Sequence, residues 1–151
     1  MNDRFRLLIE GFCALCGLPD ASRVMEGGAV VVNDVVFSLI HNDAIHPDMV
    51  FIYCDFGDVP IGREAEAYRA LLEANLYLYT GIGPAFTVSN ETGRVLLAHH
   101  YFMHDGQNMP SELREVLVDL STKALAWRAD HFLIKDGPGK RTPARARVPY
   151  R

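Results

Sequence analysis

Two cysteines, Cys13 and Cys16, have the C-x-x-C spacing of a thiol–disulfide pair or of half a zinc site. A zinc site needs four ligands, usually from two such pairs, and Cys54 is the only other cysteine in the chain. A redox pair normally follows a strand and begins a helix, whereas these cysteines fall late in a predicted helix. The sequence therefore predicts free, mostly buried thiols, with no metal and no cofactor.

Three histidines close in sequence, His99, His100 and His104, could supply metal ligands. The first two lie in a predicted strand, where neighbouring side chains point to opposite faces of the sheet. They cannot easily hold one ion together. We therefore expect these residues to be packing or surface histidines, with no metal site.

A glycine pair and a cluster of acidic residues resemble functional motifs in composition, but neither lies in the structural context that such a motif requires. Gly81-x-Gly83 follows a predicted helix and precedes a predicted strand, the reverse of a dinucleotide-binding loop, so we expect a helix stop and a turn. The densest acids could form an acid–base pair, but their positions favour a solvated loop and favourable charge near a helix start. These acids are Asp55, Asp58, Glu64 and Glu66.

The composition is that of one globular domain. A chain of 151 residues can bury a sizeable core, and 49% apolar with 23% charged residues is ordinary for such a chain. No run approaches the ~18 apolar residues of a membrane span. The N-terminus carries Glu10 inside an amphipathic pattern and lacks the unbroken apolar centre of a signal peptide. We expect a bacterial cytoplasmic protein without membrane insertion.

The net charge of −4 is unevenly distributed. Residues 136–151 carry +4 and five proline or glycine residues, which leaves −8 on residues 1–135. An acidic body argues against nucleic acid as the main partner. The sequence predicts a domain over 1–135 and a flexible basic tail over 136–151. The tail can be a solubilising end or can contact an acidic partner, RNA or a membrane-associated export gate.

The hydrophobic periodicity predicts an α+β fold in the order α-β-β-β-α-β-β-α, a twisted antiparallel sheet with helices packed on it. Residues 20–28 read as a loop because they are mixed and Gly-rich. We expect helices at about 4–16, 64–79 and 110–132, and strands at 29–32, 35–40, 49–55, 84–89 and 94–102.

The helix predicted over 64–79 has apolar residues on two faces, whereas a helix packed on one sheet needs a single stripe. The second stripe must contact another element or another copy of the chain. This favours an interaction protein that forms a dimer over a self-contained enzyme. One stripe contains Tyr68, Leu72, Leu76 and Tyr79, and the other Ala67, Leu71, Ala74 and Leu78.

This order of elements, with these residues, resembles the class I chaperones of type III secretion, the CesT (Tir chaperone) family. The resemblance covers about residues 4–132. It is carried by the first helix over 7–18, by the third strand and its Gly-x-x-Pro exit over 51–60, and by Ala70-Leu-Leu-Glu-Ala-Asn-Leu followed by Gly81-x-Gly-Pro and Val95-Leu-Leu-Ala.

The resemblance implies a small acidic homodimer that binds no nucleotide and catalyses no reaction. Such a chaperone holds the N-terminal chaperone-binding segment of one or more secreted effectors in extended form, soluble and ready for secretion. The second helix and the strands after it then form the dimer interface, and the first helix and first three strands offer apolar grooves to the effector. The predicted interface residues are Ala67, Leu71, Ala74, Leu78, Val95 and Leu97.

Effector-binding residues are predicted on the first helix and the first two strands. Because large apolar patches are uncommon on protein surfaces, we expect most of them to belong to the core and about a third to be partly exposed in the unbound dimer. They are Phe5, Leu8, Phe12, Val30, Val32, Val35, Phe37 and Leu39.

Several alternatives stay open at this stage. Asn75 can be a tolerated polar residue on the helix edge or, following the family pattern, a structural amide bonded to the neighbouring loop or to a second subunit. The chain can also be a regulatory adaptor of the same fold that binds another component of the secretion apparatus. A small thiol or redox enzyme using Cys13 and Cys16 is the less favoured reading.

Overall fold

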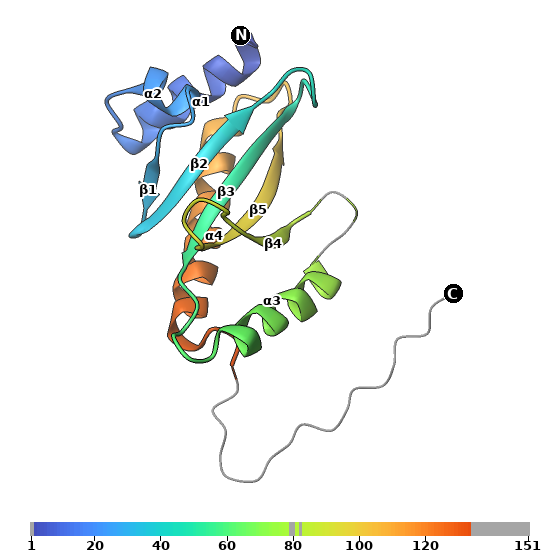
Figure 1. Ribbon diagram of the computed structural model, residues 1–151. Helices are drawn as coiled ribbons and strands as arrows, with labels where there is room; N and C mark the ends of the chain where they lie inside the picture. Colours follow the sequence, from blue (N-terminus) through green and yellow to red (C-terminus); the bar gives the residue numbers. More distant parts are fainter. Residues whose placement is uncertain (1, 79–80, 82, 134–151) are drawn as a thin grey trace.

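The protein forms an antiparallel five-stranded sheet with helices packed against it, as Figure 1 shows for the computed structural model. The structure describes residues 2–78, 81 and 83–133, so the predicted tail over 136–151 lies outside the described residues. The spatial order β1-β2-β3-β5-β4 is built from β1 (Val30–Val32), β2 (Val35–His41), β3 (Met49–Gly57), β4 (Ala85–Val88) and β5 (Val95–Phe102). The predicted α+β class and its strands are confirmed.

The described residues form four helices beside the sheet: α1 (Asp3–Cys16), α2 (Ala21–Met25), α3 (Glu64–Leu78) and α4 (Met109–Asp130). The prediction of a loop over 20–28 is wrong, because α2 lies within it. This helix of five residues is capped by the Asp20 side chain and is too short to show a helical period in the sequence. In Figure 1, α4 runs behind the sheet, α1 and α2 lie toward its β1 end, and α3 stands beside β4 at the other end.

Local capping fixes α1. The Asn2 side chain accepts hydrogen bonds from the backbone N–H groups of Arg4 and Phe5, at 2.9 and 3.2 Å, as an N-cap residue does. Gly17 ends the helix with φ of 69°, a left-handed conformation that suits glycine. The predicted boundaries of this helix are therefore confirmed.

A two-residue turn joins β1 to β2. Asn33 and Asp34 both have positive φ, 49° and 61°, and Val32 pairs directly with Val35. Positive φ at both central positions is the requirement of a type I′ turn, which matches the right-handed twist of the flanking strands. This turn sets the register of both strands, and with it the side chains that face the core.

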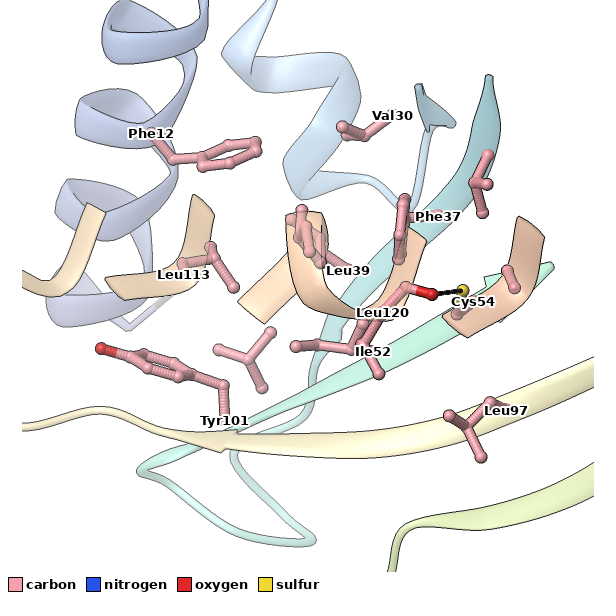
Figure 2. Packing of buried hydrophobic residues seen from close by; sticks show 14 of the residues in the cluster. Phe12, Val30, Phe37, Leu39, Ile52, Cys54, Leu97, Tyr101, Leu113 and Leu120 are labelled. Atoms are coloured by element: carbon pink, nitrogen blue, oxygen red, sulfur yellow. Dashed lines mark hydrogen bonds between the residues drawn. The ribbon is translucent and has the colours of Figure 1, made fainter. Parts of the chain in front are cut away.

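The core lies between one face of the sheet and helices α1 and α4. Figure 2 shows Phe12 of α1 and Leu113 and Leu120 of α4 pointing into the same interior as Leu39 and Ile52 of the sheet. All five side chains are buried. In Figure 1 no described helix packs across the opposite face of the sheet. Because successive side chains of a strand point to opposite faces, they alternate between the core and the surface.

Candidate functional site

The three thiols are not arranged for redox chemistry. Cys13 and Cys54 are buried, Cys16 is half-buried, and all three are free. Burial raises the pKa of Cys13 and of Cys16, and raises the pKa of Cys54 to about 12. A reactive cysteine needs a lowered pKa, because the thiolate is the nucleophile and the metal ligand. The C-x-x-C spacing therefore places packing residues at the end of α1.

The histidines separate as strand alternation predicts. His99 lies on the α4 side of β5, whereas His100 faces the other side, where its ring meets the ring of Phe51 edge-on at 5.2 Å between centroids. His104, beyond the strand, is 2.7 Å from a carboxylate oxygen of Glu112. Within residues 2–78, 81 and 83–133, no group of three or more His, Cys, Asp or Glu residues is placed to hold a metal ion.

Two of the dense acids are held by one arginine. Arg94 donates from Nε to Asp55 at 2.9 Å and from Nη1 to Asp58, also at 2.9 Å. This bridge fixes the end of β3, where the pairing with β5 slips between Asp55 and Gly57. The arrangement is structural, since both carboxylates already have a cation as partner.

The other two acids are engaged at the start of α3. The Glu64 side chain accepts a hydrogen bond from the Gly62 N–H at 3.0 Å, and Glu66 pairs with Arg63 at 2.6 Å. These hydrogen bonds lower the pKa of both carboxyls below the ordinary value. A general acid at neutral pH needs the opposite shift, so these residues support the helix start as expected.

Asn75 connects α3 to the outer edge of the sheet. Its side chain donates to the carbonyl oxygen of Phe86 at 3.1 Å and accepts from the N–H of Phe86 at 2.6 Å. Of the two interpretations left open by the sequence, the structural amide is correct. The connection between α3 and β4 includes Gly81 and Gly83, whose φ values of 100° and 101° are typical of glycines in turns.

Helix α3 leaves an apolar stripe uncovered. Ala67 and Leu71 are buried against the rest of the chain, with Leu71 only 4% exposed, whereas Leu72 is 70% and Leu76 62% exposed. Tyr77, beside them, is exposed too. We call Leu72, Leu76 and Tyr77 the α3 stripe. Two exposed leucines one turn apart on a helix with a buried opposite side are typical of a surface that contacts another protein.

Burial within the chain separates the predicted dimer-interface residues from one another, and their role in a dimer stays a prediction. Ala67, Leu71, Val95 and Leu97 lie in the chain's own core, so they have almost no surface left to give to a second copy. Ala74 is half-buried and Leu78 is at the margin of exposure. Both predicted apolar stripes are present on this helix, and the exposed one contains Leu72 and Leu76 rather than the predicted interface residues. Tyr79, at the end of the exposed stripe, lies outside the described residues.

A groove runs between α3 and β4, beside the α3 stripe. Its volume is about 430 Å³ and its lining is mostly apolar. Tyr68 and Leu72 line it from the helix, and Phe86 and Val88 from the strand. The hydrogen bonds of Asn75 to Phe86 hold its two walls together. An apolar side chain from another protein has room here next to the exposed leucines.

The predicted effector-binding residues belong almost entirely to the core. Seven of the eight are at most 3% exposed, and Val32 alone is half-buried. The expectation that about a third are partly exposed is wrong, because α2 and α4 pack against β1 and β2 and α1 packs against α4. The seven buried residues are Phe5, Leu8, Phe12, Val30, Val35, Phe37 and Leu39.

Neighbouring residues on the same elements provide the apolar surface instead. Val31 is 58% exposed, and Val36 and Ile40 are exposed on the other face of β1 and β2. On α1, Leu7 and Leu15 are exposed as well. The sequence signal was present, since an apolar run without polar alternation is apolar on both faces of a strand. That pattern does not indicate which face of each strand is covered by a helix.

A second and larger groove lies between α4 and the β4–β5 side of the sheet. Its volume is about 580 Å³. Phe86, Leu97 and Val116 contribute to an apolar floor, Phe132 lines it where the described chain ends, and His99 reaches it from β5. We call this the α4 groove. Three acids of α4 also line it, together with one lysine: Glu112, Glu115, Asp119 and Lys123.

The fold and these surfaces are typical of a protein that binds other polypeptides. Exposed apolar side chains lie on α1, α3 and the open sheet face. No described helix combines the length and the apolar character needed to cross a bilayer.

The chain belongs to the Tir chaperone protein (CesT) family of type III secretion chaperones, whose profile matches residues 7–128. The predicted family is therefore confirmed. No curated protein matches the chain.

Two solved structures show the same fold. One is the crystal structure of the ExsC–ExsE complex, in which the similar chain has a TM-score of 0.66 and 18% identity, over 85% of this chain and 94% of that one. The other is the HopA1–SchA chaperone–effector complex, with a TM-score of 0.58 and 13% identity, over 85% of this chain and 95% of that one.

Proposed function

We propose that this chain is a cytoplasmic, homodimeric chaperone that binds the N-terminal chaperone-binding segment of one or more type III effectors. The segment is held extended and competent for secretion, and no catalysis is involved. Family membership supports the class of function. The observation that carries the proposal is the α3 stripe, because it is large apolar surface that the chain's own core does not use.

The second copy contacts the α3 stripe. Leu72 and Leu76 stand beside the groove between α3 and β4, so a helix laid along them can place side chains into it. In a two-fold dimer the same patch serves both subunits, which suits a helix with one exposed apolar stripe. Burying leucine side chains of this kind contributes about 1.5–3 kcal/mol each.

The effector segment binds at the other end of the sheet. β1 is an edge strand, and its pairing of Val30 with Phe37 and Val32 with Val35 turns the backbone N–H and C=O of Val31 away from β2. An extended segment can add a strand here through main-chain hydrogen bonds. The exposed side chains of Val31, Val36 and Ile40 then supply apolar contact on the open face. Such contact offsets the ordering entropy of a disordered segment.

Co-expression tests the function directly. The chain is produced with the N-terminal ~100 residues of a candidate effector encoded beside it, a length that covers a domain-sized binding segment. We expect the segment to become soluble and to co-purify in a complex with two copies of the chaperone, measured by light scattering. Unchanged effector solubility with no co-purification contradicts the proposal. Co-purification of a secretion regulator alone from the native cell instead supports an adaptor.

A further inference from the structure

The α4 groove has the shape and charge to receive an extended basic and apolar segment. Its floor is apolar, with Phe86, Leu97 and Val116 among the lining residues. Glu112, Glu115 and Asp119 recur along α4 at helical spacing, so their carboxylates follow one side of the groove over about 10 Å. Asp119 already has an exposed ion pair with Lys123 at 2.8 Å and Glu112 is 2.7 Å from His104, so an incoming arginine must compete for Asp119 with Lys123. A matching ligand therefore presents cations on one side and small apolar groups on the other.

The last nine residues of the chain carry that pattern. In Pro143-Ala-Arg-Ala-Arg-Val-Pro-Tyr-Arg, arginines alternate with apolar residues. In an extended chain alternate side chains point to opposite sides, which puts Arg145 and Arg147 on one side and Ala144, Ala146, Val148 and Tyr150 on the other. Arginines two positions apart in an extended chain are separated by about 6.6 Å. Carboxylates four residues apart on a helix, like those of Glu115 and Asp119, are separated by about 6 Å.

The connection is short enough to make this contact intramolecular. Phe132 lines the α4 groove, and the described chain ends one residue later, at Leu133. Residues 134–142 can reach up to about 30 Å when extended. Helix α4 from Glu112 to Asp130 is itself about 27 Å long, so the last nine residues can reach any part of the groove. A segment tethered this closely has an effective concentration in the millimolar range.

We propose that residues 143–151 bind in the α4 groove of their own chain, with arginines toward Glu115 and Asp119 and apolar side chains toward the floor. The C-terminal segment is then a built-in occupant that an incoming basic segment must displace. This proposal does not depend on effector binding elsewhere on the molecule, since it concerns the chain alone.

Limited trypsin digestion of the full chain tests the contact, because bound arginines are protected from cleavage. The initial rate of cleavage after Arg145 is followed by intact mass spectrometry. We expect the double variant Glu115→Gln, Asp119→Gln to be cleaved about 2- to 10-fold faster than the wild type, the effect of losing two surface charge pairs. The matched control neutralises two exposed acids outside the groove, Glu26→Gln and Glu91→Gln, and leaves the rate unchanged.

A second variant tests the apolar half of the contact. Val148→Ser with Tyr150→Ser should also accelerate cleavage after Arg145, and in the full chain it should shift the NMR amide signals of Val116 and Ala126 but not that of Val31. Equal cleavage rates in the wild type and both variants overturn the proposal. Loss of protection from trypsin on tenfold dilution also overturns the proposal, because the bound segment then comes from a second copy of the chain. If a variant changes the sedimentation mass of the protein but not its cleavage rate, the α4 groove binds the folded domain of a second copy. That result also overturns the proposal.

Discussion

The side chain of Asn75 forms with the backbone of Phe86 the pair of hydrogen bonds that a neighbouring strand would form. Nδ2 donates to the carbonyl at 3.1 Å and Oδ1 accepts from the N–H at 2.6 Å. Phe86 lies on β4, at one edge of the sheet. At this position the edge is therefore closed by α3, whereas Val31 on β1, at the other edge, keeps its outward backbone groups for a partner. The two edges thus have different uses.

Replacing Asn75 with alanine should destabilise the protein by about 1–3 kcal/mol, because the buried backbone groups of Phe86 lose their partner. Chemical denaturation checks this value. A suitable control is Glu73→Ala on the same helix, which removes only an exposed pair with Arg69 and should cost less than about 0.5 kcal/mol. Equal stability of the two variants would show that water replaces the amide at the edge.

The two stripes of α3 should respond differently to a charge. Leu72→Glu or Leu76→Glu places a carboxylate on the exposed stripe, so we expect a folded monomer whose unfolding temperature is lowered only by the loss of dimer stabilisation. Leu71→Glu is the matched variant on the buried side, where a carboxylate costs several kcal/mol and unfolds or aggregates the chain. Sedimentation and thermal melts separate these results. A Leu72→Glu protein that is still dimeric would place the interface elsewhere.

The helices and strands were predictable because each has a clear period and clear end signals. Asn2 and Gly17 limit α1, and the Asn33–Asp34 turn sets the first hairpin. The sheet order was not predictable, because it depends on contacts between strands far apart in the sequence. Helix α2 was missed because its five residues give no periodic signal.

The candidate site was predicted only in kind. The sequence contains two apolar stripes on α3. Which stripe packs against the chain's own core depends on the rotation of the helix against β4, and Asn75 helps to fix that rotation. The same limit applies to β1, where Val30 and Val31 are alike in type and face opposite sides of the sheet. Register decides which is core and which is surface, and a shift of one residue exchanges them.

Strand addition at β1 can be tested with proline. Val31→Pro removes the outward N–H at an exposed edge position, where proline is tolerated. We expect the affinity for the effector segment to fall about 3- to 10-fold, the effect of one lost hydrogen bond. Val31→Ala keeps the N–H and should weaken binding less. Isothermal titration with the purified segment measures both variants, and equal affinities would mean that the backbone of β1 takes no part.

The thiols should differ in reactivity. Burial raises the pKa of Cys54 to about 12, so its thiolate at pH 8 is about 1,000-fold scarcer than that of an ordinary cysteine of pKa 9. We expect iodoacetamide to modify the half-buried Cys16 first and to leave Cys54 unmodified in the native protein. Mass spectrometry over time follows the reaction, and the same reaction in denaturant provides the control. Early modification of Cys54 would indicate an opening of the core around Leu120, whose carbonyl oxygen lies 4.0 Å from the sulfur.

His99 should make the protein less stable in mild acid. Burial lowers its pKa below the ordinary value of 6.5, with smaller contributions from His100 and Lys123, while Asp119 acts in the opposite direction. Above pH 6.5 the ring is neutral in both folded and unfolded chains and adds no pH dependence. Below pH 6.5 the unfolded chain takes up the proton first, so stability falls until the pH reaches the folded-state pKa.

NMR titration of the His99 ring measures this shift directly, and its midpoint should lie below 6.5. Denaturation curves between pH 7 and 5 provide the second measurement, in which His99→Gln should lose less stability than the wild type because it removes the titrating group. A midpoint at or above 6.5, or identical pH profiles for the two proteins, would mean that solvent or Asp119 stabilises the charged ring in the α4 groove.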